Sequence, residues 1–175
     1  MKKKSANTPL SSKVLDTEKI ALLEDILAKG LSIRIQVTGN SMTPFLRSGE
    51  ILTIRKVLPG SLRIGDLIFF KTPEELPVLH RIIEKKRGRD NVCLFRTKGD
   101  AVSTMDELVT EHNILGKVCR VERTIADYRE KHLDMELPIW KAMNFSLALV
   151  SLGKGKIASH PALAGLLRRI KKAFV

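Results

Sequence analysis

The feature that most restricts the fold of this chain is a series of short apolar runs separated by turn residues. From Ser32 the hydrophobic period is two, because Ile33, Ile35 and Val37 alternate with polar residues. Further runs suited to strands follow at 51–57, 66–71, 78–84, 92–97 and 114–122, and Gly, Pro and Asp lie between them. Several short strands at this spacing are typical of a barrel or sandwich. The sequence therefore predicts an α+β chain that is mainly β.

A helix is predicted on the N-terminal side of the strands. Its apolar residues, Ile20, Leu23, Ile26 and Leu27, recur at helical spacing. Asp16 or Thr17 is expected to cap its start, and Gly30 is expected to end it. We expect this helix to pack on the strands that follow it.

The sequence changes character after Glu136. The stretch 138–152 is apolar, and Gly153-Lys154-Gly155-Lys156 is expected to interrupt it. Pro161 is expected to open a further amphipathic helix. These patterns predict a disordered basic arm over 1–15, a β-rich domain over 16–136 and a basic, amphipathic helical tail over 137–175.

The excess of basic residues is concentrated at the two ends of the chain. The formal net charge is +12, but residues 1–15 contribute four Lys and residues 137–175 contribute seven Lys or Arg, with no acid in either segment. The segment between them carries a balance of only +1. The two ends are therefore the parts expected to attract a polyanion, such as anionic lipid, nucleic acid or an acidic partner.

Composition excludes several classes of protein. The two cysteines, Cys93 and Cys119, are too few for a disulfide scaffold or a four-cysteine zinc site, and both fall on predicted strands, where we expect buried thiols. No apolar run is long enough to span a bilayer, and no apolar region of the signal-peptide kind follows the basic start. We therefore expect a chain that is not exported.

A serine at the end of the first predicted strand is the strongest candidate for chemistry. The strand leads into the segment TGNSMTP at 38–44, in which Ser41 follows a turn that contains glycine. A nucleophile with an oxyanion hole requires an exposed hydroxyl with backbone N–H groups beside it. Taken alone, such a serine is more often an ordinary turn residue, so the pattern itself leaves both interpretations open.

Further motifs follow Ser41 in a fixed order. They read RIGDLIFF at 63–70, VLHRII at 78–83, FRTKGD at 95–100 and ILGKV at 114–118. This succession resembles the serine peptidases of the type I signal peptidase and LexA-like clan, from about Ile33 to Val121. His80 occupies the position where many members carry a lysine. In this respect the chain resembles the archaeal and endoplasmic-reticulum type of signal peptidase, whose general base is histidine.

The resemblance implies a role for each matching residue. Ser41 would be the nucleophile, His80 the general base and Asp106 the third member, with Asp100 as the alternative. Histidine suits this task because it exchanges a proton near neutral pH, and a carboxylate on its far nitrogen fixes the tautomer. Such a mechanism uses no metal or cofactor, and none is expected. The turn expected to form the oxyanion hole comprises Gly39, Asn40, Met42 and Pro44.

Two features depart from the pattern of signal peptidases. Those enzymes usually carry a serine two residues before the nucleophile, where this chain has Gly39. They are also tethered to a membrane, whereas this chain resembles short, stand-alone bacterial members of the clan. We therefore expect a cytoplasmic protein in peripheral contact with the inner membrane surface.

The apolar stripe of the C-terminal tail has two interpretations. It is most often a packing face, and alternatively it lies on anionic lipid with its basic residues toward the headgroups. The residues expected to contact a membrane are Trp140, Arg168, Arg169, Lys171 and Lys172.

These features are compatible with three functions to different degrees. The resemblance favours a serine endopeptidase that cleaves a peptide or protein precursor. The alternative is a non-catalytic peptide- or nucleic-acid-binding module that retains the fold, although only 5% of residues are aromatic and no RNA-binding motif occurs. A LexA-like self-cleaving regulator is disfavoured, because one predicted helix, rather than a helix-turn-helix, precedes Ser41 and the lysine base is missing.

Overall fold

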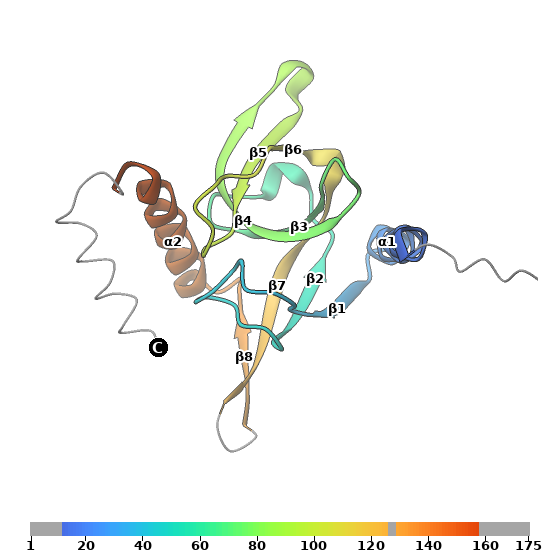
Figure 1. Cartoon of the computed structure of the whole chain (residues 1–175), viewed down its shortest axis with the longest axis horizontal. Helices are drawn as coiled ribbons and strands as arrows, with labels where there is room; N and C mark the ends of the chain where they lie inside the picture. Colours follow the sequence, from blue (N-terminus) through green and yellow to red (C-terminus); the bar gives the residue numbers. More distant parts are fainter. Residues whose placement is uncertain (1–11, 126–128, 158–175) are drawn as a thin grey trace, which may run out of the picture.

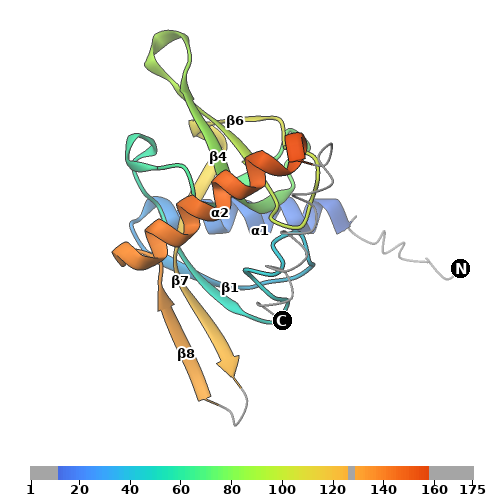
Figure 2. The same cartoon turned by 90° about the vertical axis from the view of Figure 1, so that its left-hand side faces the viewer.

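The computed structural model describes residues 12–125 and 129–157. An antiparallel sheet of eight strands curls around the core, with helices on two opposite sides of it (Figure 1, Figure 2). The predicted β-rich α+β class is therefore confirmed. The elements are α1 (Ser12–Ala28), β1 (Ser32–Gln36), β2 (Ile51–Arg55), β3 (Leu67–Lys71), β4 (Pro77–Arg87), β5 (Cys93–Lys98), β6 (Leu108–Thr110), β7 (Ile114–Ile125), β8 (Arg129–Asp134) and α2 (Pro138–Ile157), with short 3-10 turns at Pro59–Ser61, Arg89–Asn91 and Glu111–Asn113.

The long strand β7 connects the two parts of the sheet. The strand order is β1-β2-β7-β3-β4-β5-β6, and β8 also pairs with β7. β7 pairs with β2 over residues 117–122, with β3 over 114–117 and with β8 over 120–125. The hairpin β1–β2 is therefore joined to the strands β3–β6 by pairing with β7.

Strand β3 separates two apolar clusters because both of its faces are buried. Leu67 and Phe69 belong to a cluster with residues of α1, β1, β2 and β7, while Ile68 and Phe70 belong to a second cluster with residues of β4 and β5. The period of two along a strand sends successive side chains to opposite faces. An uninterrupted apolar run was therefore the right signal for a strand covered on both sides.

Helix α1 ends as expected but begins earlier. Gly30 has φ +77°, its N–H donates to the Leu27 carbonyl, and the Leu31 N–H donates to the Ile26 carbonyl. This pair of bonds is the Schellman motif, which favours glycine because of the positive φ. The expected cap at Asp16 or Thr17 is wrong, since the helix already begins at Ser12.

Helix α2 packs against the sheet through one face. Asn144, Ala148 and Ser151 are buried there, and Gly65 (φ +98°) lies so close that a Cβ on it would be 2.7 Å from the Phe145 nitrogen. The helix runs through 153–156 to Ile157, so the expected interruption there is wrong. Glycine lowers helix propensity by only about 1 kcal/mol, and the contacts of the preceding turns offset that cost.

Three further features compare with the sequence expectations: the two cysteines, the strands β6 and β8, and the character of the helices. Cys93 is buried on β5, but Cys119 on β7 is only half-buried. Strands β6 and β8 were not predicted, because β6 has three residues and β8 is mostly charged. In the parts of the chain that the structure describes, neither helix has the length and apolar character needed to cross a bilayer.

Candidate active site

Ser41 lies in the loop that connects β1 to β2. The loop is closed at its base, where the Val37 N–H donates to the Glu50 carbonyl at 2.8 Å and the Gly49 N–H donates to the Val37 carbonyl at 3.0 Å. Met42 and Leu46 anchor it, since both side chains are buried in the first apolar cluster. The loop that carries the half-buried Ser41 is therefore held by hydrogen bonds at both ends and by two buried side chains in between.

An ion pair from β7 holds the same loop on its other side. Arg123 bonds the carboxylate of the buried Glu50 through Nε, and its Nη2 donates to the Phe45 carbonyl at 2.7 Å. Glu50 Oε2 in turn accepts the Arg47 N–H at 3.2 Å. Charge-assisted bonds of this kind are the stronger class of hydrogen bond, so they limit the movement of the segment that carries Ser41.

His80, on strand β4, is bonded to Asp106. The distance from His80 Nδ1 to Asp106 Oδ2 is 2.6 Å, and the Thr97 hydroxyl donates to the same carboxylate oxygen at 2.7 Å. The Asp106 N–H also donates to the Thr97 carbonyl at 2.9 Å, which ties the loop carrying Asp106 to β5. Because a carboxylate accepts, His80 carries its proton on Nδ1, and Nε2 is left as the acceptor.

The surroundings of Gly99 show that the Ser41 backbone lies near His80 Nε2. A Cβ added at Gly99 would be 2.7 Å from the Ser41 carbonyl oxygen and 3.0 Å from His80 Nε2. Both atoms therefore lie within 3.0 Å of one point. The Ala101 N–H donates to the same Ser41 carbonyl at 2.8 Å, so the turn after β5 holds the Ser41 backbone in this place.

Asp100, the alternative third member, is engaged elsewhere. Its two carboxylate oxygens accept bonds from Arg81 Nε at 2.8 Å and Nη2 at 2.7 Å. Arg81 is fully buried, and its Nη1 donates to the Gly65 carbonyl and to Asn144 Oδ1 of α2. Because the bidentate pair occupies both oxygens of Asp100, the structure brings Asp106, and not Asp100, to the imidazole.

The residues expected to shape the oxyanion hole lie in the turn around Ser41. Gly39 has φ +84°, which turns the chain ahead of Ser41, and the Asn40 carbonyl accepts the N–H and hydroxyl of Thr43. Met42 is buried and Pro44 is exposed. Within the described residues the Ser41 N–H donates to no backbone carbonyl, so it is available to an incoming oxygen.

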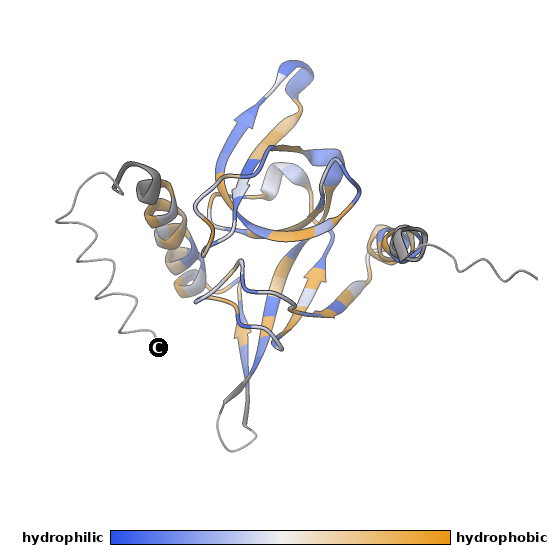
Figure 3. Cartoon of the chain, viewed as in Figure 1, coloured by the Kyte–Doolittle hydropathy of each residue, from blue (hydrophilic) through white to orange (hydrophobic). Residues whose placement is uncertain are grey.

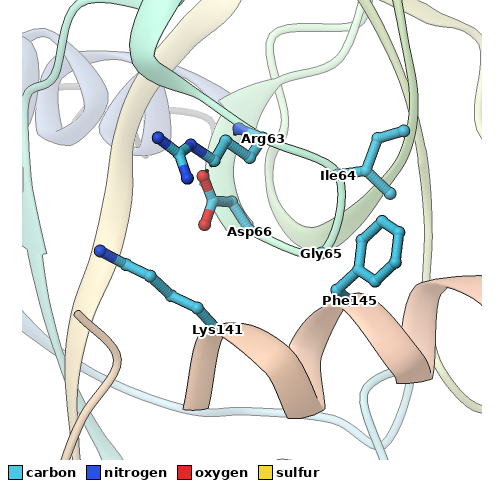
Figure 4. Close-up of a pocket in the computed structure, with 6 residues that line it drawn as sticks. All are labelled: Arg63, Ile64, Gly65, Asp66, Lys141 and Phe145. Atoms are coloured by element: carbon cyan, nitrogen blue, oxygen red, sulfur yellow. Dashed lines mark hydrogen bonds between the residues drawn. The ribbon is translucent and has the colours of Figure 1, made fainter. Parts of the chain in front are cut away.

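Two cavities lie on the surface near these elements. One, of about 310 Å³, reaches His80 and Asp106 and is lined further along by Phe70, Val78 and Val109. The other, of about 350 Å³, lies between the 63–66 turn and helix α2 (Figure 4). The smaller cavity contains candidate catalytic groups, whereas the larger one contains none, so the smaller one is the better candidate for a substrate.

The wall of the larger cavity is stabilised by a chain of ion pairs. Lys117 Nζ lies 3.0 Å from Asp66 Oδ1 and 2.9 Å from Glu136 Oε1, and Lys141 lies 2.9 Å from Glu136 Oε2. Burial favours a lower pKa of Lys117, but Glu136 and Asp66 outweigh it and raise that pKa above 10.5. Burial likewise favours a higher pKa of Glu136, but Lys117 and Lys141 hold it below 4.5.

Sequence reasoning missed the residues that arrange the site. Thr97 and Gly99 belong to the FRTKGD segment, but nothing in its pattern shows that Thr97 bonds a carboxylate or that Gly99 separates two loops. Arg81, next to His80 in a strand, reads as a solvated base. The available signal was the apolar residues on both sides of it, which indicate that this part of β4 is covered.

Other candidate residues lie away from the site. Trp140 is half-buried and packs against the first apolar cluster. His112 and His132, the other histidines of the described residues, are exposed. Arg168, Arg169, Lys171 and Lys172 lie outside the described residues.

Comparison with known proteins shows a partial similarity to a signal peptidase subunit. The chain is 33% identical over 67 residues to the signal peptidase complex catalytic subunit sec11 of Dictyostelium discoideum. The match covers 38% of this chain and 37% of that protein, so the chain matches little more than a third of its relative. No model of a known protein family matches the chain. The similarity supports a distant relationship to the signal peptidase-like proteins.

Proposed function

We propose that this protein is a serine endopeptidase of the signal peptidase-like class, with Ser41 as nucleophile, His80 as general base and Asp106 as the residue that orients the base. The observation that carries the proposal is the 2.6 Å bond from His80 Nδ1 to Asp106, with Nε2 facing the Ser41 segment across Gly99. The partial similarity to a signal peptidase subunit supports the same class.

The first half of the reaction forms an acyl-enzyme. Ser41 Oγ attacks the carbonyl carbon of the scissile peptide bond while its proton passes to His80 Nε2. The carbonyl oxygen becomes an oxyanion, and the Ser41 N–H donates to it. When the carbon–nitrogen bond breaks, the His80 proton goes to the leaving amine.

The second half releases the acyl group. A water molecule attacks the ester carbonyl and gives a proton to His80 Nε2, which returns it to Ser41 Oγ as the ester bond breaks. In both halves Asp106 stabilises the positive imidazolium. The Thr97 hydroxyl holds the Asp106 carboxylate in place through its 2.7 Å bond.

Labelling with a fluorophosphonate probe tests the nucleophile without knowledge of the substrate. We expect the wild-type chain to be labelled and Ser41→Ala to be unlabelled. Ser48→Ala is the matched control, because Ser48 lies in the same loop. Its hydroxyl donates to the Val37 carbonyl at 3.5 Å, a long and therefore weak bond whose loss should change the loop little. Labelling of Ser41→Ala at the wild-type rate would refute the proposal.

A second pair of variants tests the base. His80→Gln removes the proton acceptor and is expected to lower the labelling rate by at least about 100-fold. His112→Gln, at an exposed histidine outside the site, is expected to label like the wild type. A binding module that keeps the fold without activity would give no labelling in any of these proteins.

A further inference from the structure

Helix α2 presents an apolar surface to solvent. Ile139 is 72% exposed, Leu149 50% and Phe145 46%. Much of the α2 ribbon is orange in Figure 3, and the helix lies at one side of the molecule. At 100° per residue Ile139 and Leu149 fall on the side of α2 opposite Asn144, Ala148 and Ser151, and Phe145 falls at the edge of that side. We call this surface the outer face of α2; its exposed residues are Ile139, Ala142, Phe145, Ser146, Leu149 and Val150.

The inner face of the helix is fixed, so the outer face cannot bury itself by rotation. Arg81 Nη1 donates to Asn144 Oδ1 at 2.8 Å, and the buried Lys98 donates to the Ser151 carbonyl at 2.9 Å. The backbone at Gly65 touches the backbone of α2 and allows no side chain between them. Rotation of α2 about its axis would remove one hydrogen-bond acceptor from the charged Arg81 side chain, and this loss is costly because Arg81 is buried.

A surface helix of this composition is unusual. Such helices normally present charged and polar residues to water, but over residues 139–152, whose side chains the structure describes, the outer face of α2 carries no charged residue. A contiguous exposed apolar surface marks a site of interaction. The nearest charge on an exposed part of the helix is Lys141, which bonds Glu136.

We propose that the outer face of α2 docks on an anionic lipid bilayer. The charge of the neighbouring sequence selects this occupant, because residues 137–175 contain seven Lys or Arg and no Asp or Glu. An anionic bilayer attracts this segment while its acyl region receives the apolar side chains. A symmetric contact between two copies would bring two such basic segments together, and their repulsion opposes it.

The docked helix lies in the plane of the interface. The apolar face of an interfacial helix enters the boundary of the acyl region, and the basic residues remain among the headgroups. Asn144 and Ser151 meanwhile stay bonded to the sheet. Binding therefore requires no rearrangement of the elements that carry Ser41 and His80.

Energy transfer from Trp140 measures the docking directly. Trp140 is the only tryptophan of the chain and lies on α2, so transfer to a dansyl-labelled lipid reports contact near this helix. We expect transfer with vesicles of phosphatidylcholine and phosphatidylglycerol, and little transfer with phosphatidylcholine alone. Equal transfer with both vesicle types, or none with either, contradicts the proposal.

Substitutions on the outer face identify the surface. Ile139→Ser with Leu149→Ser is expected to weaken binding to the anionic vesicles by at least about tenfold, because two apolar side chains no longer leave water. The matched control is Leu22→Ser with Leu58→Ser, since these leucines are 59% and 79% exposed elsewhere on the molecule. Equal loss in the control pair would overturn the assignment of the surface to α2.

Two other occupants give different results. If a second copy covers the face, light scattering will show a dimer that Ile139→Ser with Leu149→Ser abolishes. If another segment of this chain covers it, the same variant will lose thermal stability and keep its vesicle binding. Either result refutes docking on lipid. Ser41→Ala is expected to bind vesicles like the wild type, so failure of the proposed activity and failure of docking are distinguishable.

Discussion

Substitution of Gly99 by alanine tests the geometry of the candidate site at its narrowest point. The added Cβ would lie 2.7 Å from the Ser41 carbonyl oxygen, 3.0 Å from His80 Nε2 and 3.0 Å from Val102 Cγ2. Gly99 is not in the left-handed region, so alanine introduces no backbone strain there. The effect of Gly99→Ala is therefore steric, and it falls between the backbone carbonyl of Ser41 and the imidazole of the proposed base.

The size of the effect follows from these distances. Ordinary contact begins at 3.4 Å, so relief of the closest contact requires a movement of about 0.7 Å. A misplacement of about 1 Å costs on the order of 100-fold in rate. We therefore expect the fluorophosphonate labelling rate to fall by about 10- to 100-fold, with a loss of about 1–3 kcal/mol in the free energy of unfolding from the overpacked site.

Two glycines provide controls for this experiment. Gly116→Ala creates an equally close contact, with its Cβ 2.7 Å from the Arg55 carbonyl oxygen. This contact lies between strands β7 and β2 and not at the candidate site. It should lose comparable stability in urea and label within about twofold of the wild type, because its contacts touch no candidate catalytic residue. Gly60→Ala faces open space and should change neither quantity. Two results would refute the reasoning: labelling of folded Gly99→Ala at the wild-type rate, or a labelling rate of Gly116→Ala that falls as much as that of Gly99→Ala.

Four further substitutions test the roles of other groups. Asp106→Asn is expected to lower the labelling rate by about 100-fold or more with little change in stability, whereas Asp100→Asn leaves the buried Arg81 charge without its counterion and should cost about 3–5 kcal/mol in urea unfolding. Gly65→Ala meets the α2 backbone at a positive φ and should cost about 2 kcal/mol or more, measured by thermal unfolding. Glu136 has a lowered pKa in the folded chain, so the stability it contributes is present above pH 4.5 and lost as pH falls through the folded-state pKa. The difference in unfolding free energy between the wild type and Glu136→Gln should accordingly shrink below that pH, and a constant difference would contradict the ion-pair assignment.

The strands that the sequence predicts well are those with one clear pattern. Ile33 and Ile35 alternate with polar residues on β1, and the continuous run of β3 indicates burial on both faces. In strand β8, REKHLD, Leu133 is the one buried residue among 131–134, the part of the strand whose side chains are described. Its place depends on pairing with β7, which is a property of the whole sheet and leaves no local hydrophobic period.

The candidate site shows the same division between local and distant determinants. Ser41 and His80 could be selected because each lies in a short motif in a recognised order. The resemblance favoured Asp106 over Asp100, but the local sequence does not show the physical reason, which depends on Arg81 on the opposite face of β4 from His80. Only the folded sheet shows that Arg81 takes one carboxylate and leaves the other for the imidazole.

The late position of β7 in the chain has a consequence for synthesis on the ribosome. The hairpin beside Ser41 pairs with β7, whose first residue is Ile114, and the strand that carries His80 is joined to β7 through β3. Because a nascent chain emerges from its N-terminus, both pieces leave the ribosome before the strand that aligns them. A growing chain therefore lacks the strand that joins these two pieces of the sheet until β7 has emerged. Under the proposed function, the catalytic groups are fully assembled only at this late stage of synthesis.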